Sequence, residues 1–125
     1  MIITNESKLS FKLQEIGFTV KITSSPESKR NLIIPSSIYH QGHEYIITDL
    51  DEGLFQFNEN IKTVTFSAES QFRSIPDYAF YTSSLEVIVI PDSVTSIGTF
   101  SFAWCNSLRQ INFSKNSKLH SIQKQ

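Results

Sequence analysis

Two histidines near position 40 are the first residues whose types and spacing could do chemistry. His40 and His43 flank Gln41-Gly42, and on a two-residue hairpin their imidazoles could face each other across the strands and hold a metal ion. Zinc would need at least two more ligands, and only Glu44 or Asp49 lies near in the sequence. Because polar residues at a hairpin tip are usually solvated, we expect no metal site here.

Acidic and sulfur-bearing side chains give two further candidates. Asp49, Asp51 and Glu52 form a small cluster that could recruit calcium, and a solvated loop explains them equally well. Cys105 could be a nucleophile if a histidine activated it, but we expect a buried packing thiol. Neither a Gly-rich phosphate loop nor the spacing of a catalytic triad or metal site occurs. We therefore predict that the chain is not an enzyme and binds no cofactor.

The composition excludes some partners and leaves the compartment open. The formal net charge is −1 and the densest basic group is Lys29-Arg30, so we expect no nucleic-acid partner. No stretch approaches the roughly 20 apolar residues that span a bilayer, so we expect no membrane insertion. Residues 1–7 lack signal-peptide features, which predicts a soluble, non-exported chain. The single cysteine fits a reducing compartment without excluding an extracellular one.

An internal repeat supplies the elements that would position these side chains. Its first block reads apolar-x-x-apolar-x-apolar and recurs at intervals of 24 and 23 residues, at 61–66, 85–90 and 108–113. Its second block reads apolar-x-Ser-Ile and follows at 72–75, 94–97 and 119–122. A third, aromatic block follows at 78–80 and 100–102. Three blocks that recur in the same order indicate a solenoid.

The first block predicts strands that stack into a parallel sheet. Alternation along each strand turns positions 64, 66, 88, 90, 111 and 113 inward, and positions 65, 89 and 112 outward. The second block returns the chain along the opposite side, and Phe80 and Phe102 of the third block fill the space between. One coil cannot bury its own apolar edge, so neighbouring coils must supply the core.

The segment Leu85 to Ser107, LEVIVIPDSVTSIGTFSFAWCNS, resembles the BspA-like leucine-rich repeat. Ten residues match the family pattern: Leu85, Ile88, Ile90, Pro91, Ser93, Val94, Ile97, Gly98, Phe102 and Cys105. Ser101 replaces the usual Ala, and the copy from Ile61 carries Pro76 and Ser83 in place of Gly and Cys. The resemblance covers roughly residues 31 to 122 and implies a leucine-rich-repeat solenoid with short irregular or 3-10 segments between strands.

The chain is expected to form one domain of about four coils. An N-terminal β-hairpin cap and loop occupies 1–30, with strands around Phe11 and Phe18–Thr23 and a polar loop containing Pro26. The first repeat, 31–60, carries a hairpin insertion at 38–46. Further repeats follow at 61–84 and 85–107, and a partial one at 108–125.

The last copy stops after Ile122, without its third block or a polar cap. We expect either a truncated chain or a short family member, in preference to a specific end-to-end dimer. Fraying of residues 114–125 is expected if nothing covers them.

Outward positions of the predicted sheet form the candidate partner-binding surface. Val87 and Val89 are apolar where the repeat needs no apolar residue, and an exposed apolar patch is a candidate interface. Equally, β-branched residues there favour the strand itself. The full candidate set is Ile33, Thr63, Thr65, Val87, Val89, Gln110 and Asn112. Sequons occur at Asn5 and Asn112, and without a signal peptide we expect neither to be used.

The favoured function is a protein–protein interaction module. The family resemblance implies a cell-surface, adhesion-type role with a host matrix or cell-surface protein as ligand, although the chain lacks a signal peptide. The alternative is an intracellular scaffold that self-associates, as a homodimer, through the uncapped C-terminal coil.

Overall fold

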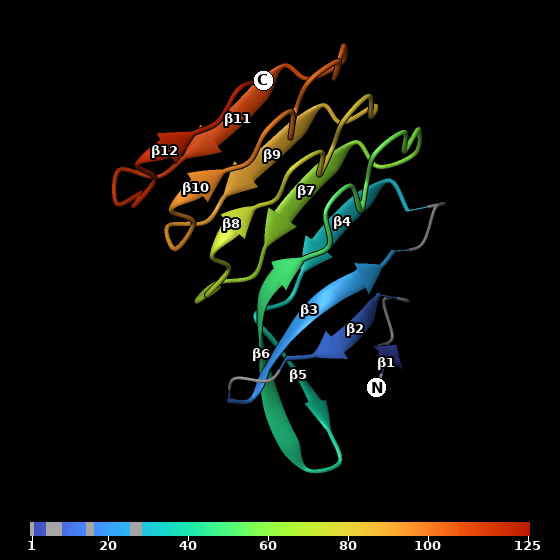
Figure 1. Cartoon of the computed structure of the whole chain (residues 1–125), viewed down its shortest axis with the longest axis vertical. Helices are drawn as coiled ribbons and strands as arrows, with labels where there is room; N and C mark the ends of the chain where they lie inside the picture. The colour runs from blue at the N-terminus through green and yellow to red at the C-terminus, as the bar shows by residue number, and fades with distance from the viewer. Residues whose placement is uncertain (1, 5–8, 15–16, 26–28) are drawn as a thin grey trace.

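The computed structural model describes residues 2–4, 9–14, 17–25 and 29–125. Within these ranges the regular elements are all β-strands, and the chain winds into a solenoid whose coils stack along one axis (Figure 1). The N-terminal strands lie at one end of the stack, and the last coil lies at the other. In the described part of the chain, no helix is long and apolar enough to cross a membrane. Asn5 and Pro26 lie outside the described residues.

The N-terminal end is closed by a five-stranded sheet of order β1-β2-β3-β6-β5. Strand β1 (Ile2–Thr4) pairs antiparallel with β2 (Ser10–Leu13), and β2 pairs antiparallel with β3 (Thr19–Ser24), which confirms the predicted capping hairpin. Strand β3 then runs parallel to β6 (His43–Leu50). Alternate side chains from this cap, those of Phe11, Val20 and Ile22, are fully buried and close the end of the core.

The predicted hairpin insertion is confirmed. Strand β5 (Ser37–His40) pairs antiparallel with β6, and Gln41 and Gly42 form the turn with φ angles of 50° and 80°. Two consecutive residues with positive φ are typical of the tight turns that match the twist of paired strands. The hairpin projects from the N-terminal end of the stack (Figure 1).

The first wall of the solenoid is a parallel sheet of order β11-β9-β7-β4. Its strands are β4 (Asn31–Ile34), β7 (Thr63–Phe66), β9 (Val87–Ile90) and β11 (Gln110–Phe113). Val64, Ile88 and Ile90 are buried as alternation predicts, because each coil covers the apolar edge of its neighbour.

The second wall is a narrower parallel sheet made from the Ser-Ile dipeptides. Strands β8 (Ser74–Ile75), β10 (Ser96–Ile97) and β12 (Ser121–Ile122) pair in register, with the isoleucines of β8 and β10 buried. Directly after this wall, neighbouring coils pack closely against each other. A Cβ added at Gly98 would lie 2.6 Å from the backbone nitrogen of Asp77. The neighbouring coil therefore leaves no room for a side chain at position 98.

The third wall consists of turns at 52–57, 77–82 and 99–104, which we call the turn wall. Alternate N–H groups donate to the next coil; those of Phe55 and Phe80 bond to the carbonyls of Ala79 and Ser101 at 2.9 and 2.8 Å. Inside this wall Phe55, Phe80 and Phe102 stack with ring centroids 5.1 and 5.5 Å apart. The predicted irregular segments are therefore hydrogen-bonded turns, and the aromatic filling of the core is confirmed.

The last coil departs from the predicted inward orientation. Phe113 pairs in register with Ile90, yet 43% of Phe113 is exposed and Ile111 is only half-buried. Ile122 is also exposed, at 58%. The physical reason is that none of the described residues stacks on the outer edge of β11 and β12. Residues 114–125 complete a return path, with β12 paired to β10.

Candidate interaction surface

The outward side chains of β4, β7, β9 and β11 form one surface, which we call the sheet face. Its most exposed apolar residues are Ile33, at 61%, and Val89, at 39%. Register pairs Ile33 with Thr65, and Val89 with Asn112, so these four residues form one row across the coils. The structure therefore brings together the residues that alternation placed outside.

A second row runs beside the first. Val87 pairs with Thr63 on one side and Gln110 on the other, and the Thr63 hydroxyl donates to Asn31 Oδ1 at 2.7 Å. All seven predicted partner-binding residues thus lie on the sheet face, and their binding role stays a prediction. The two rows are uncharged and mix β-branched side chains with amides and hydroxyls. Such a surface can bury apolar area while satisfying a few hydrogen bonds, as protein interfaces do.

The two histidines meet at the tip of the hairpin, as predicted. His40 and His43 are direct partners in the β5–β6 ladder, and His43 stacks on Phe18 with ring centroids 5.2 Å apart. Among the described residues, no group of three or more His, Cys, Asp or Glu side chains could hold a metal ion. At the same tip, the negative charge of Glu44 raises the pKa of Tyr39 above its ordinary value of 10.0.

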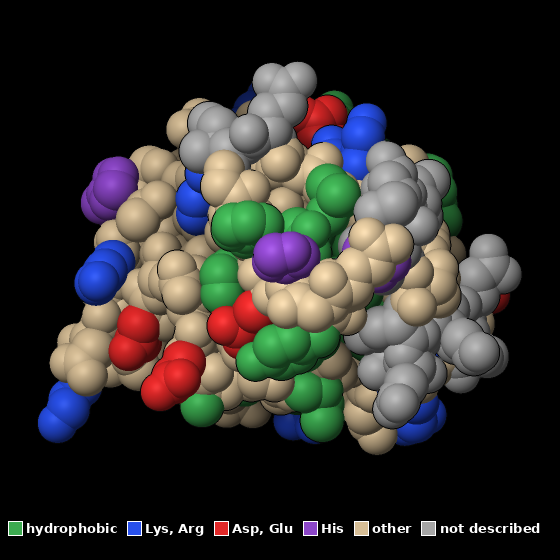
Figure 2. All heavy atoms as spheres, turned by 90° about the horizontal axis from the view of Figure 1, so that it is seen from below, with side chains coloured by type: hydrophobic (Ala, Val, Ile, Leu, Met, Phe, Trp, Pro, Cys, Tyr) green, Lys and Arg blue, Asp and Glu red, His purple; other side chains and the backbone are tan. Residues whose placement is uncertain are grey.

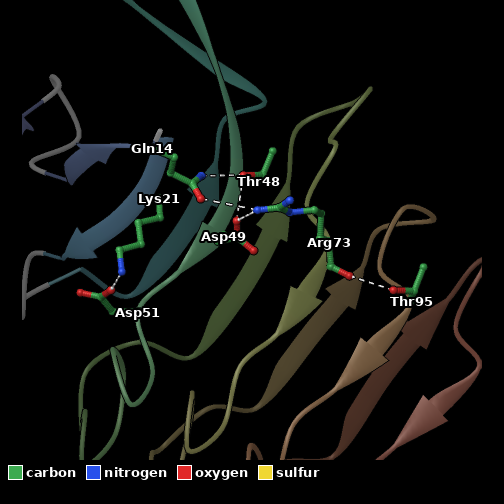
Figure 3. A network of polar contacts seen from close by, with 7 residues as sticks. All are labelled: Gln14, Lys21, Thr48, Asp49, Asp51, Arg73 and Thr95. Atoms are coloured by element: carbon green, nitrogen blue, oxygen red, sulfur yellow. Dashed lines mark hydrogen bonds and ion pairs between the residues drawn. The ribbon is translucent and has the colours of Figure 1, made fainter. Parts of the chain in front are cut away.

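The acidic cluster is paired with cations from the cap and from the second coil (Figure 3). Lys21 lies 2.9 Å from Asp51, and the Arg73 guanidinium contacts the Asp49 carboxylate. Gln14 extends this network by donating to the Thr48 hydroxyl at 2.8 Å. Asp51 therefore links the end of β6 to β3, and Asp49 links β6 to the next coil, a structural role that accounts for these two carboxylates.

Cys105 is half-buried, in contrast to the buried thiol that the repeat predicts. Its Sγ donates to the Phe80 carbonyl at 2.8 Å and lies 3.5 Å from Ser83 Oγ. The difference arises because Cys105 belongs to the last full coil, which only a partial coil covers. Packing and hydrogen bonding to the preceding coil explain the thiol without a nucleophilic role.

Exposed aromatic side chains form two surfaces that the sequence reasoning missed. On the turn wall, Phe57, Tyr78 and Trp104 are exposed at 60%, 39% and 69%. At the hairpin end, a histidine lies among hydrophobic side chains (Figure 2). Phe18, which stacks on His43, and Tyr39 of β5 are exposed at 57% and 74%. The turn-wall aromatics could have been found in the sequence from Tyr78. It is the first aromatic residue of the third block and precedes the buried Phe80 by two positions.

The three-walled coil, with its strand sheet and stacked phenylalanines, is a leucine-rich-repeat solenoid. The family model described as "BspA type Leucine rich repeat region (6 copies)" matches residues 30–125. The chain therefore belongs to the BspA-type leucine-rich-repeat family, which confirms the resemblance of its repeats.

Solved structures of other proteins share the fold. The pneumococcal vaccine antigen PcpA matches with a TM-score of 0.68 and 22% identity, over 99% of this chain and 40% of that one. A leucine-rich cell surface protein of Faecalibacterium prausnitzii matches at 0.52 and 18%, over 98% and 50%. A leucine-rich-repeat protein of Bacteroides capillosus matches at 0.54 and 24%, over 98% and 71%.

The chain thus spans half or less of the first two structures and about seven tenths of the third. At these identities the likeness shows the fold alone. No curated protein matches the chain.

Proposed function

We propose that the chain is a protein-binding module that contacts its partner through the sheet face. The observation that carries the proposal is the uncharged row from Ile33 to Asn112, in which Ile33 and Val89 expose apolar area to solvent. Membership in a leucine-rich-repeat family supports a protein-interaction role, since solenoids present extended binding surfaces. The chemistry of the surface supports binding and not catalysis.

The partner class that we propose is a host matrix or cell-surface protein. Support comes from the fold neighbours, one of which is described as a cell surface protein and another as a pneumococcal vaccine antigen. The sheet face carries no excess of either charge, so apolar contact and hydrogen bonding must provide most of the affinity. Neither a nucleic acid nor a membrane is part of the proposal.

Replacing Val87 and Val89 together with Glu tests the proposal. Two carboxylates at the centre of the sheet face would lose their hydration on binding, so affinity should fall at least about tenfold. Binding is measured on immobilised fibronectin, laminin and collagen, with circular dichroism to confirm that the fold survives. The matched control places Glu at the exposed positions Gln71 and Asn116, which lie outside the strands of the sheet face, and should bind like the original chain.

Two outcomes would contradict the proposal. Unchanged affinity in the folded double variant would exclude the sheet face as the contact. Failure of the original chain to bind any of the three proteins would exclude a matrix protein as the partner.

A second candidate function is an intracellular scaffold that self-associates through its last coil. The exposed apolar side chains of Phe113 and Ile122 at the outer edge of β11 and β12 favour it. Against it, the last coil carries Arg109, Lys115, Lys118 and Lys124, and no acidic residue follows Asp92. Two such ends would repel each other at low ionic strength.

Light scattering across a range of protein and salt concentrations separates this candidate from the first. A scaffold should dimerise more strongly as salt screens the lysines, and Phe113→Lys should abolish the dimer. A monomer at every concentration and salt level would exclude it.

A further inference from the structure

The turn wall displays a chain of aromatic side chains that the sheet-face proposal does not use. Phe57 contacts Tyr81 edge-on with ring centroids 5.8 Å apart, and Tyr81 contacts Tyr78 at 5.4 Å. Tyr78 in turn lies 5.7 Å from Phe100. Trp104 completes the surface on the next coil and is the most exposed of these residues. Rings from three successive coils therefore face solvent along the solenoid axis.

Four of the turn-wall aromatic residues adopt a left-handed backbone conformation. Phe57, Tyr78, Phe100 and Trp104 adopt φ angles of 61°, 58°, 53° and 59°. Bulky side chains in this left-handed region cost about 1–3 kcal/mol each, whereas glycine adopts it freely. Gly53 occupies the turn position equivalent to Tyr78, so glycine fits these turns. Thr82 also adopts this conformation, with a φ of 54°, so the turn sets the φ angle, and aromatic residues fill four of its six left-handed positions.

A pocket of about 520 Å³ opens beside the first of these rings. Its volume lies within the range of small-ligand sites. Its lining residues are Thr23, Ser24, Ser25, Leu54, Gln56, Phe57, Asn58, Glu59 and Asn60. Seven of these nine side chains carry an amide, a hydroxyl or a carboxylate, and none is basic. Phe57 belongs both to the pocket and to the aromatic chain.

We propose that the turn wall binds a neutral oligosaccharide, with one sugar in the pocket at Phe57. A pyranose ring presents an apolar C–H side that packs on an aromatic ring and a rim of hydroxyls that both donate and accept. Gln56 and Asn60 offer both a donor and an acceptor to such hydroxyls. The Glu59 carboxylate only accepts, so it favours a ligand with donors.

The lining also argues against other occupants. Anionic glycans and nucleic acids need cations, and no Lys or Arg lines the pocket. A proline-rich peptide also packs on aromatics, but its prolines lack an N–H, so it offers Glu59 fewer donors than a sugar does. A neutral sugar chain can pack its C–H side on the rings and hydrogen-bond to the polar side chains of the pocket.

The spacing of the rings suits an extended ligand. Phe57, Thr82 and Trp104 occupy the same position in successive turns, since the N–H groups of Phe57 and Thr82 donate to the next coil in the same pattern. Phe57 and Trp104 are therefore separated by two coils, or about 10 Å at the usual inter-strand spacing. A saccharide seated in the pocket can reach Trp104 across Tyr81 and Thr82.

Trp104 gives a direct test because it is the only tryptophan in the chain. Its fluorescence is followed as neutral tetrasaccharides of glucose, mannose and N-acetylglucosamine are added to about 10 mM, ten times the Kd of a weak site near 1 mM. At least one should shift the emission saturably. A heparin tetrasaccharide and a proline-rich decapeptide should not.

Variants locate the site. Phe57→Ala should weaken saccharide binding at least about tenfold, as truncation of a central aromatic does. Phe18→Ala removes an equally exposed ring from the cap and should leave binding unchanged. Val87→Glu with Val89→Glu should also leave it unchanged, which separates this site from the sheet face.

The proposal is overturned if no neutral tetrasaccharide shifts the emission, if Phe57→Ala binds as well as the original chain, or if only heparin or the peptide binds.

Discussion

At the scale of residues, the stacked phenylalanines connect the core of successive coils. Phe80 lies between Phe55 and Phe102 with interplanar angles of 10° and 4°, and only 1% of it is exposed. Its ring therefore packs against both neighbouring coils.

Replacing Phe80 with Ala should lower the free energy of unfolding by about 3–5 kcal/mol, because a cavity is left between two coils. Urea denaturation measures the change. Tyr39→Ala, at a position 74% exposed, should cost far less and serves as the control. A loss below about 1 kcal/mol for Phe80→Ala would contradict the stacked core.

The sequence patterns predicted the buried side chains better than the exposed ones. The periodic blocks identified Phe80 and Phe102 as core residues because burial recurs with the repeat. They did not identify Tyr78 and Phe100 as surface residues, since exposure depends on left-handed turns that alternation does not describe. The patterns also did not predict the hydrogen bonding of Ser101, which is fully buried with its hydroxyl 2.7 and 2.8 Å from the Pro76 and Gly98 carbonyl oxygens.

At the scale of elements, a polar network connects the cap to the solenoid. Arg73 contacts Asp49 on β6, and its backbone carbonyl accepts a hydrogen bond from the Thr95 hydroxyl of the next coil at 3.3 Å (Figure 3). Gln14 joins from the cap through Thr48. Two coils and the cap thus share one set of contacts.

Arg73→Ala should loosen the cap with little effect on global stability. Arg73 is 62% exposed, so the ion pair contributes at most about 1 kcal/mol. The change should appear as faster amide hydrogen exchange in β3 and at Gln14. Lys118→Ala also removes one cation, but in the last coil, and serves as the control. It should leave the amide exchange of β3 unchanged. Unaltered exchange in Arg73→Ala would show that the network does not hold the cap.

Both hairpins and the parallel sheet were predictable because local patterns specify them. Alternation sets which side chains face the core, and Gln41-Gly42 marks the turn. The β1 strand and the parallel pairing of β3 with β6 were not predicted, since they depend on contacts distant in sequence. The candidate rows on the sheet face followed from alternation and repeat length, which together determine the register.

At the scale of the whole molecule, the solenoid separates its surfaces by wall. The sheet face is uncharged and β-branched, the turn wall is aromatic, and the last coil is basic and apolar at its outer edge. Separate walls allow separate ligands, because each wall repeats one chemistry along the axis. The sheet face is the surface to which the proposed function assigns the protein partner.

Side-chain footprinting of the complex tests that assignment most directly. The chain is exposed to hydroxyl radicals alone and with the matrix protein that binds it, and oxidation is read at each residue by mass spectrometry. The account predicts protection of Ile33 and Val89 on the sheet face and unchanged oxidation of Trp104 on the turn wall. Protection of Trp104 with Ile33 and Val89 unchanged would contradict it.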